Sequence, residues 1–224
     1  MRLKHPPRPI DEFLATAKRD GLPIALETFD LPASPSLGDF TLPRATQIFA
    51  AANDVKVLCG ERIEDTYTIP IVVSAPETQA LNLPPQFAIV FTLRGEHVDQ
   101  VAFEDTWPAN IPQAVETFVR RINNADVEAV AGSFCPGALL NDELTEYWCH
   151  DQIREWAAES VARTSLTLYT RRVVVGPNTV VLLAEVDGTF DKRGLPHPLL
   201  LSFYFTLHEG GIAQLIILRN VSNL

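Results

Sequence analysis

One hairpin pattern occurs twice in this chain of 224 residues. The stretch "FTLRGEHVDQVAF" begins at Phe91, and "FTLHEGGIAQLII" begins at Phe205, 114 residues later. In both copies apolar residues alternate ahead of a polar turn that contains glycine, and a second apolar segment follows. Glycine in the turn allows the positive φ that tight hairpins require. The pattern predicts two antiparallel hairpins of the same kind, each with one buried face.

The segments ahead of the two hairpins also match, at a separation of 105 residues. "IDEFLATAKRDGLPIALETF" aligns with "VETFVRRINNADVEAVAGSF", which places Phe13 on Phe118 and Phe29 on Phe134. Repeats of this length indicate a duplicated unit. We therefore expect two tandem units, 1–108 and 109–224, divided near "EDTWPANIP", where prolines interrupt a strand or helix. The alternative is a chance likeness between two ordinary amphipathic hairpins.

Secondary structure is clearest in the second unit. The pattern predicts helices over 111–124, 126–134 and 150–163, and then strands over 164–175, 179–186, 199–208 and 211–219. Asp151 is expected to cap the third helix. Helices followed by antiparallel strands predict an α+β fold with the helices on one face of a sheet. In the first unit, the proline-bearing stretch "FDLPASPSLGDFTLP" is expected to be an ordered loop or lid, with disorder as the alternative.

Charge and composition exclude several classes of partner. The net charge is −10 and the isoelectric point about 4.9, so nucleic acid and anionic membrane surfaces are unfavourable partners. Three cysteines without regular spacing predict neither a disulfide framework nor a zinc site, and we expect no metal or cofactor. The N-terminus does not resemble a signal peptide, and no apolar run approaches the ~20 residues of a membrane span. The expected location is cytoplasmic.

A family resemblance joins these patterns. "EYWCHDQIREWAAES", followed by "VVLLAEVDGTF" and "LLLSFYFTLHEGGIAQLIILRN", resembles the nuclear transport factor 2-like (NTF2-like) superfamily, in particular its SnoaL-like branch. Glycine is usual in the family where Cys149 stands. The resemblance implies a cone in each unit, formed by a curved antiparallel sheet wrapped around N-terminal helices with a pocket at the open end. It covers roughly 111–220, and the first unit would be a degenerate copy.

Candidate site residues follow from the chemistry of such a pocket. Cofactor-independent catalysis requires an ionisable group in a mostly apolar cavity, where burial moves its pKa towards neutrality. The candidate catalytic residues are His150 and Asp187. The candidate ligand-binding residues, two of which could supply flat apolar walls, are Tyr147, Trp148, Trp156 and Tyr204.

Each of the polar candidates also has a simpler interpretation. His150 could be a solvated residue at a helix start, and Asp187 could belong to a turn or to the wet face of a strand. Tyr204 could line the pocket or lie on the outer sheet face through which many members of the family form dimers. In the first unit the matching positions are mostly apolar. We therefore expect the second unit to hold the pocket, and a larger, more polar cavity in the first unit would contradict this.

Three functions are compatible with the sequence. The first is a cofactor-independent isomerase, cyclase or dehydratase acting on a hydrophobic substrate. The second is a non-catalytic binder of a small hydrophobic or amphipathic molecule. The third is an assembly module that uses its sheet faces. Either a homodimer or pairing of the two units within one chain is compatible with the last.

Overall fold

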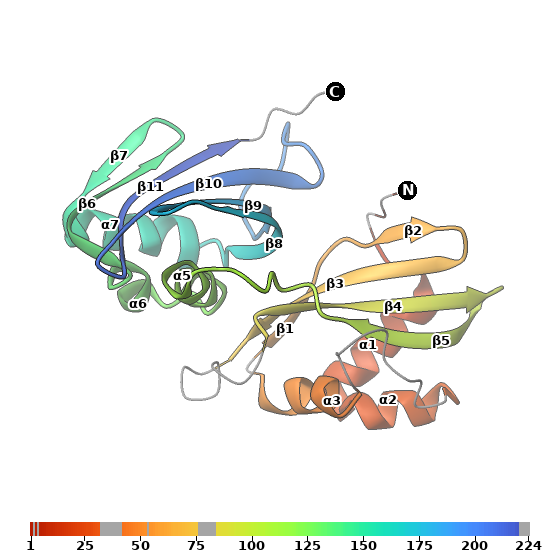
Figure 1. Cartoon of the computed structure of the whole chain (residues 1–224). Coiled ribbons are helices and arrows are strands. Elements are labelled where there is room, and N and C mark those ends of the chain that lie inside the picture. Colours follow the sequence, from red (N-terminus) through yellow and green to blue (C-terminus); the bar gives the residue numbers. More distant parts are fainter. Residues whose placement is uncertain (2, 4, 32–41, 53, 76–83, 220–224) are drawn as a thin grey trace. The chain divides into compact units, whose positions relative to one another are not determined.

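The computed structural model describes residues 1, 3, 5–31, 42–52, 54–75 and 84–219 (Figure 1). The chain divides into two compact units, Met1–Trp107 (unit 1) and Pro108–Leu224 (unit 2), one residue from the expected boundary. Most of the proline-bearing stretch expected to form a loop or lid, residues 32–41, lies outside the described residues.

Unit 2 is a six-stranded sheet with helices packed on one face (Figure 1). Its elements are α5 (Gln113–Asn123), α6 (Val127–Ala131), β6 (Phe134–Asp142), β7 (Thr145–Trp148), α7 (Cys149–Trp156), η1 (Ala157–Ala162), β8 (Thr167–Val175), β9 (Thr179–Asp187), β10 (Leu199–His208) and β11 (Gly211–Arg219). The strand order is β7-β6-β11-β10-β9-β8. The helices contribute fully buried side chains such as Val115, Phe118 and Ile153, because the apolar stripe of each helix faces the sheet.

The predicted strands of unit 2 are confirmed at β9, β10 and β11, but two strands were missed. β6 and β7 form a hairpin between α6 and α7, and β6 pairs in parallel with β11. β6 contains Pro136 and Gly137, which break a strand pattern in sequence, and its register with β11 is shifted at this point. The turn places Glu143 and Leu144 at φ values of 47° and 76°, a conformation that sequence rules assign to Asn-Gly.

The start of α7 also differs from expectation. Its N-cap is Trp148, whose backbone amide donates to Gln152 Oε1 at 2.7 Å. The prediction that Asp151 caps this helix is wrong, since its carboxylate accepts from Arg154 Nη1 at 2.7 Å instead. Cys149 has a φ of 60°, in the left-handed region that favours glycine. From Ala157 the helix continues as the π-helix η1.

Unit 1 repeats most of this plan. Its elements are α1 (Arg8–Asp20), α2 (Leu22–Thr28), α3 (Leu42–Ala51), β1 (Asp54–Val57), β2 (Glu61–Ile63), β3 (Thr66–Ser74), β4 (Gln86–Arg94) and β5 (His97–Glu104). The strand order is β1-β3-β4-β5, and β2 also pairs with β3. β1 and β2 together thus occupy the place that β8 has in unit 2. Among the described residues of unit 1, no strand corresponds to β6 or β7.

The sequence repeat is present in three dimensions as two matching phenylalanine triads. In unit 1 the ring of Phe13 lies edge-on to Phe91, with ring centroids 5.3 Å apart. In unit 2, Phe118 and Phe205 lie in the same way at 5.4 Å. The third members, Phe29 and Phe134, contact Phe13 and Phe118 at 5.5 Å and 5.9 Å. Each aromatic pair contributes about 0.5–1.5 kcal/mol of stability beyond that of burying its apolar surface.

Two backbone features repeat at the same separations. A β-bulge interrupts the last hairpin of each unit, between Thr92 and Leu93 in unit 1 and between Thr206 and Leu207 in unit 2. The first helix of each unit begins after a proline N-cap that has no side-chain capping bond. The α+β class and the tandem repeat are therefore confirmed.

Candidate functional site

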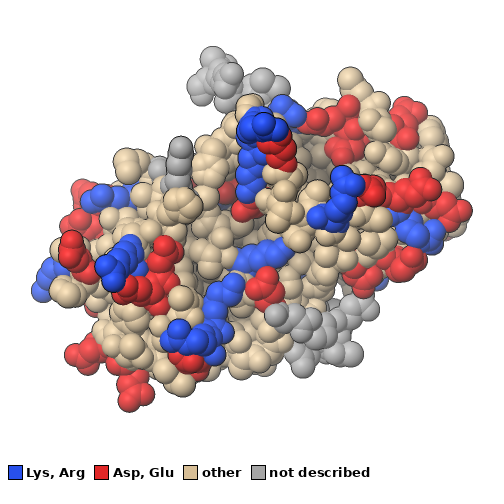
Figure 2. Space-filling view, turned by 180° about the vertical axis from the view of Figure 1, so that it is seen from behind, with Lys and Arg blue, Asp and Glu red and all other residues tan. Residues whose placement is uncertain are grey.

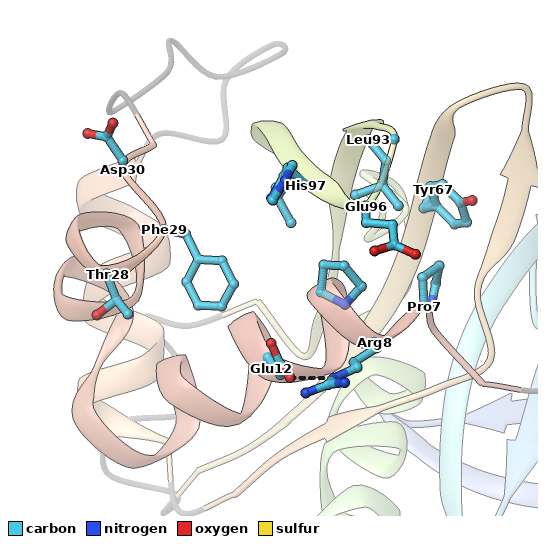
Figure 3. A pocket seen from close by; sticks show the side chains of 13 residues that line it. Pro7, Arg8, Glu12, Thr28, Phe29, Asp30, Tyr67, Leu93, Glu96 and His97 are labelled. Carbon is cyan, nitrogen blue, oxygen red and sulfur yellow. Dashed lines mark hydrogen bonds and ion pairs between the residues drawn. The ribbon is translucent and has the colours of Figure 1, made fainter.

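Each unit has a cavity at the same place in its fold. The cavity of unit 1 has a volume of about 730 Å³ and lies between the start of α1, the end of α2 and the β4–β5 hairpin (Figure 3). The cavity of unit 2 has a volume of about 440 Å³ and lies between the start of α5, the end of α6 and the β10–β11 hairpin. Their linings match at the two repeat separations, for example Pro7 with Pro112, Phe29 with Phe134 and Leu93 with Leu207.

The expectation that unit 2 holds the larger and more polar cavity is wrong. The unit 1 cavity is larger, and its described lining includes the ionisable residues Arg8, Glu12, Asp30, Tyr67, Glu96 and His97. The described lining of the unit 2 cavity includes one charged residue, Arg121. The error arose because the first unit has the less regular sequence and because its polar residues lie at a helix start and a hairpin turn.

Aromatic and charged side chains face the unit 1 cavity from different elements (Figure 3). The Phe29 ring extends from the end of α2 into the space beneath the β4–β5 hairpin, and Glu96 extends from that hairpin towards the start of α1. On α1, Arg8 Nε donates to Glu12 Oε1 at 2.8 Å. Tyr67 is buried, and the Arg62 guanidinium lies 5.3 Å from the centre of its ring. The cavity therefore combines an apolar wall with several exposed ionisable groups.

The unit 2 cavity is neutral apart from its arginine. Arg121 Nη1 donates to Ala129 O at 2.9 Å and to Ser133 Oγ at 3.0 Å. Thr117 and Gly210 stand at the positions that Glu12 and Glu96 occupy in unit 1. Corresponding elements form the two cavities, but the charges of their linings differ.

The structure does not bring the two predicted catalytic residues together. His150 Nε2 lies 2.7 Å from Phe134 O, and Phe134 pairs with Ile212 at the hairpin end of the sheet. Asp187 is the last residue of the nine-residue strand β9, whose first residue, Thr179, pairs with Thr206 near the β10–β11 hairpin. Asp187 therefore lies about 26 Å along the strand from that end of the sheet, at ~3.3 Å per residue. Its Oδ1 accepts from Gly188 N at 2.8 Å and contacts Lys192 Nζ. Neither residue is in the described lining of either cavity.

The four predicted ligand-binding residues also lie apart. Tyr147 pairs with Leu140 in the β6–β7 hairpin, and Trp148 is half exposed with its indole N–H 3.2 Å from Glu146 Oε2. Trp156 is buried under the sheet. Tyr204 lies between the inward Phe203 and Phe205 and is 41% exposed, so it is on the outer sheet face. Their roles stay predictions.

Sequence reasoning missed Asp142, the carboxylate that Trp156 contacts. Trp156 Nε1 donates to Asp142 Oδ2 at 2.9 Å. Burial raises the pKa of Asp142, nearby Glu143 adds to the rise, and the indole hydrogen bond partly opposes it. The only signal in the sequence was an acidic residue at the end of a strand that was itself missed.

A second carboxylate of unit 2, Glu185, has a structural partner. Glu185 is 4% exposed, and Arg171 donates to its Oε2 from Nε at 3.2 Å and from Nη2 at 2.5 Å. The Arg171 guanidinium also lies 4.7 Å from the centre of the Tyr169 ring. Glu185 is therefore held in an ion pair within the sheet.

Three further features concern charged patches on the surface, groups that could bind a metal and helices that could span a membrane. On the face drawn in Figure 2, Lys and Arg lie beside Asp and Glu rather than in a separate basic patch. The described residues include no group of three or more His, Cys, Asp or Glu side chains placed to hold a metal ion. Within the same residues, every helix is too short or too polar to cross a bilayer.

Comparisons with known proteins find similarity among solved structures. No family model and no curated protein matches the sequence. Among solved structures, an NTF2-like protein from Cytophaga hutchinsonii is 11% identical, with a TM-score of 0.41, over 52% of this chain and 95% of that chain. Each unit of this chain is built as the resemblance implied, with a sheet wrapped around helices.

Two further solved structures match about half of this chain. A protein from Sinorhizobium meliloti classed with the polyketide cyclases is 24% identical, with a TM-score of 0.44, over 48% of this chain and 95% of its own. A protein with a ketosteroid isomerase-like fold from Catenulispora acidiphila, solved with trimethylamine, is 14% identical. Its TM-score is 0.44, over 50% of this chain and 89% of its own.

Proposed function

We propose that the chain binds a small amphipathic molecule carrying a positive charge, in the cavity of unit 1. The observation that carries this proposal is a cavity of about 730 Å³ in which Phe29 and Tyr67 stand beside carboxylates. Small-molecule sites in proteins have volumes of roughly 300–1,000 Å³ and combine apolar walls with a few polar groups.

The charge of the lining supports a cationic ligand. Arg8 and Glu12 form an ion pair, so their charges largely offset each other. Asp30 and Glu96 add negative charge to the remaining lining. An organic cation would gain from these carboxylates and from the face of an aromatic ring, which contributes roughly 0.5–2 kcal/mol. Leu93 and Val98 provide apolar contact for the rest of such a molecule.

The finer part of the proposal concerns chemistry. The sequence resemblance implies a cofactor-independent isomerase, cyclase or dehydratase, and such an enzyme requires a proton-carrying group beside its substrate. Glu96, His97 and Tyr67 line one cavity and can supply such groups. His150 and Asp187 lie at opposite ends of a sheet. We therefore assign any proton transfer to the unit 1 cavity.

Calorimetric titration of the full chain with choline tests the binding. Choline should bind, and its uncharged carbon analogue 3,3-dimethylbutan-1-ol (dimethylbutanol) should bind about threefold more weakly, because one exposed charge contact is worth up to about 1 kcal/mol. Glu96→Gln should weaken choline binding by a similar factor. Glu159→Gln, which removes the same charge from η1 in unit 2, should leave it unchanged.

Two results would contradict the proposal. One is equal affinity for choline and dimethylbutanol. The other is an equal effect of the Glu96 and Glu159 variants, which would show that choline responds to the net charge of the protein rather than to this cavity.

A further inference from the structure

The cavity of unit 2 differs from its counterpart in a consistent way. At the positions of the three carboxylates that line the unit 1 cavity, Glu12, Asp30 and Glu96, the repeat separations place Thr117, Cys135 and Gly210. All three replacements are uncharged. Where unit 1 has Thr16, unit 2 has Arg121, which lines the cavity. Gln113 stands at the position of Arg8, so the lining loses three carboxylates and keeps one arginine, which lies at a different position.

The Arg121 guanidinium is held in place within the cavity wall. Its Nη1 donates to Ala129 O at 2.9 Å and to Ser133 Oγ at 3.0 Å, both at the α6 end of the cavity. A guanidinium fixed by such bonds loses less conformational freedom when it binds an oxyanion, and its planar fork matches a carboxylate.

Other parts of the lining also favour a small molecule that carries a carboxylate. The first turn of α5 borders the cavity, and the first amide groups of a helix have no acceptor within the helix. The ring of Phe134 and the side chain of Leu207 provide apolar contact. The nearest acid of the hairpin, Glu209, is exposed beside His208, with 3.7 Å between Glu209 Oε1 and His208 Nε2, and it is not part of the described lining.

We propose that the unit 2 cavity is a second binding site, which takes the carboxylate of a small organic anion against Arg121. This site is distinct from the unit 1 cavity and has the opposite charge preference. A volume of about 440 Å³ accommodates a ligand of one ring and a carboxylate. The protein as a whole has a net charge of −10, so the selectivity must come from this local exchange of residues.

Titration of the full chain with benzoate and with benzamide tests the site. The two probes share shape and ring, and only benzoate carries the charge. Benzoate should bind with a Kd in the millimolar range or better, and benzamide about tenfold more weakly, because charged hydrogen bonds to arginine are the stronger kind.

Thr117→Glu is the decisive variant, because it restores the acid of unit 1 one helical turn from Arg121. A glutamate four residues ahead of an arginine pairs with it on a helix. The variant should weaken benzoate binding about tenfold and leave choline binding unchanged. Thr145→Glu adds the same charge at an exposed position on β7, outside the described cavity lining, and should change benzoate affinity less than twofold.

Arg121→Gln gives a second measurement, with its thermal unfolding recorded because Arg121 also binds α6. It should abolish the preference for benzoate over benzamide. The proposal is overturned if benzoate does not bind, if benzamide binds equally well, or if Thr117→Glu and Thr145→Glu have equal effects. Failure of choline binding alone would reject the function proposed for unit 1 and leave this site standing.

Discussion

The phenylalanine triads of the two units have nearly the same geometry, whereas the cavities beside them differ in charge. The ring pairs Phe13–Phe91 and Phe118–Phe205 agree within 0.1 Å in separation and within 3° in interplanar angle. Side chains at the rims, such as Glu96 and its counterpart Gly210, do not agree in chemistry. Close packing restricts what a core position accepts, whereas an exposed rim position tolerates most residues. The two units therefore share a packed frame and differ in the residues that line their cavities.

The largest expected effect comes from breaking the frame at matched positions. Phe13→Ala and Phe118→Ala each remove a fully buried ring and should each lower the free energy of unfolding by about 3–5 kcal/mol. Urea denaturation measures both. Phe190→Ala, in the half-buried loop after β9, should cost clearly less. A loss below about 1 kcal/mol at only one of the matched sites would show that the triads are not equivalent.

A second prediction concerns a place where the sheets differ. In unit 2, Glu185 pairs with Leu200 across the sheet. At the corresponding position in unit 1, Val72 pairs with Gln86. Arg171→Met leaves the buried Glu185 carboxylate without this arginine and should cost about 3 kcal/mol or more.

The double variant Arg171→Met with Glu185→Val gives unit 2 the apolar residue of unit 1. It should be more stable than Arg171→Met alone, because two apolar side chains replace a buried charge. Denaturant midpoints of the two variants decide the point. If the double variant is no more stable than the single one, the sheet position cannot accept the residue that unit 1 has there.

The smallest effect depends on pH and belongs to unit 2. Burial raises the pKa of Asp142, so the folded protein holds this proton more tightly than the unfolded chain does. The free energy of unfolding therefore falls as the pH rises from the ordinary aspartate range through the raised pKa. Asp142→Asn keeps an oxygen for the Trp156 indole and carries no charge, so its stability relative to the natural protein should increase across that window.

Urea denaturation at a series of pH values measures this difference. If the difference in the free energy of unfolding between Asp142→Asn and the natural protein does not change with pH, the raised pKa of Asp142 is contradicted. Glu143→Gln serves as a control, because it removes the neighbouring charge and should reduce the pH dependence without abolishing it.

The sequence predicted the frame better than the site. The alternation along 199–208 and 211–219 gave both strands at their observed bounds, and the repeat identified all six rings of the triads. Alternation and helical spacing are local signals, so they survive without knowledge of the fold. β6 was missed because Pro136 and Gly137 lie within it, and its parallel partner β11 is about 75 residues away in sequence.

The cavity residues could not be found in the same way. Glu12 and Glu96 belong to a helix start and a hairpin turn, where acidic residues are common for local reasons. Only the packing of α1 beneath the β4–β5 hairpin brings them to one cavity. His150 and Asp187 belong to the segments that resemble the family, and the distance between them depends on which end of the sheet each one occupies.

The most direct test of the divergence between the two cavities is one set of amide NMR spectra of the full chain with choline or benzoate. Choline should shift the amide signals of Glu96 and His97, and benzoate should shift those of Gly210 and Gly211. Shifts of the same hairpin by both probes, or of neither hairpin, would contradict the account that duplication gave this chain two matched cavities of opposite charge preference.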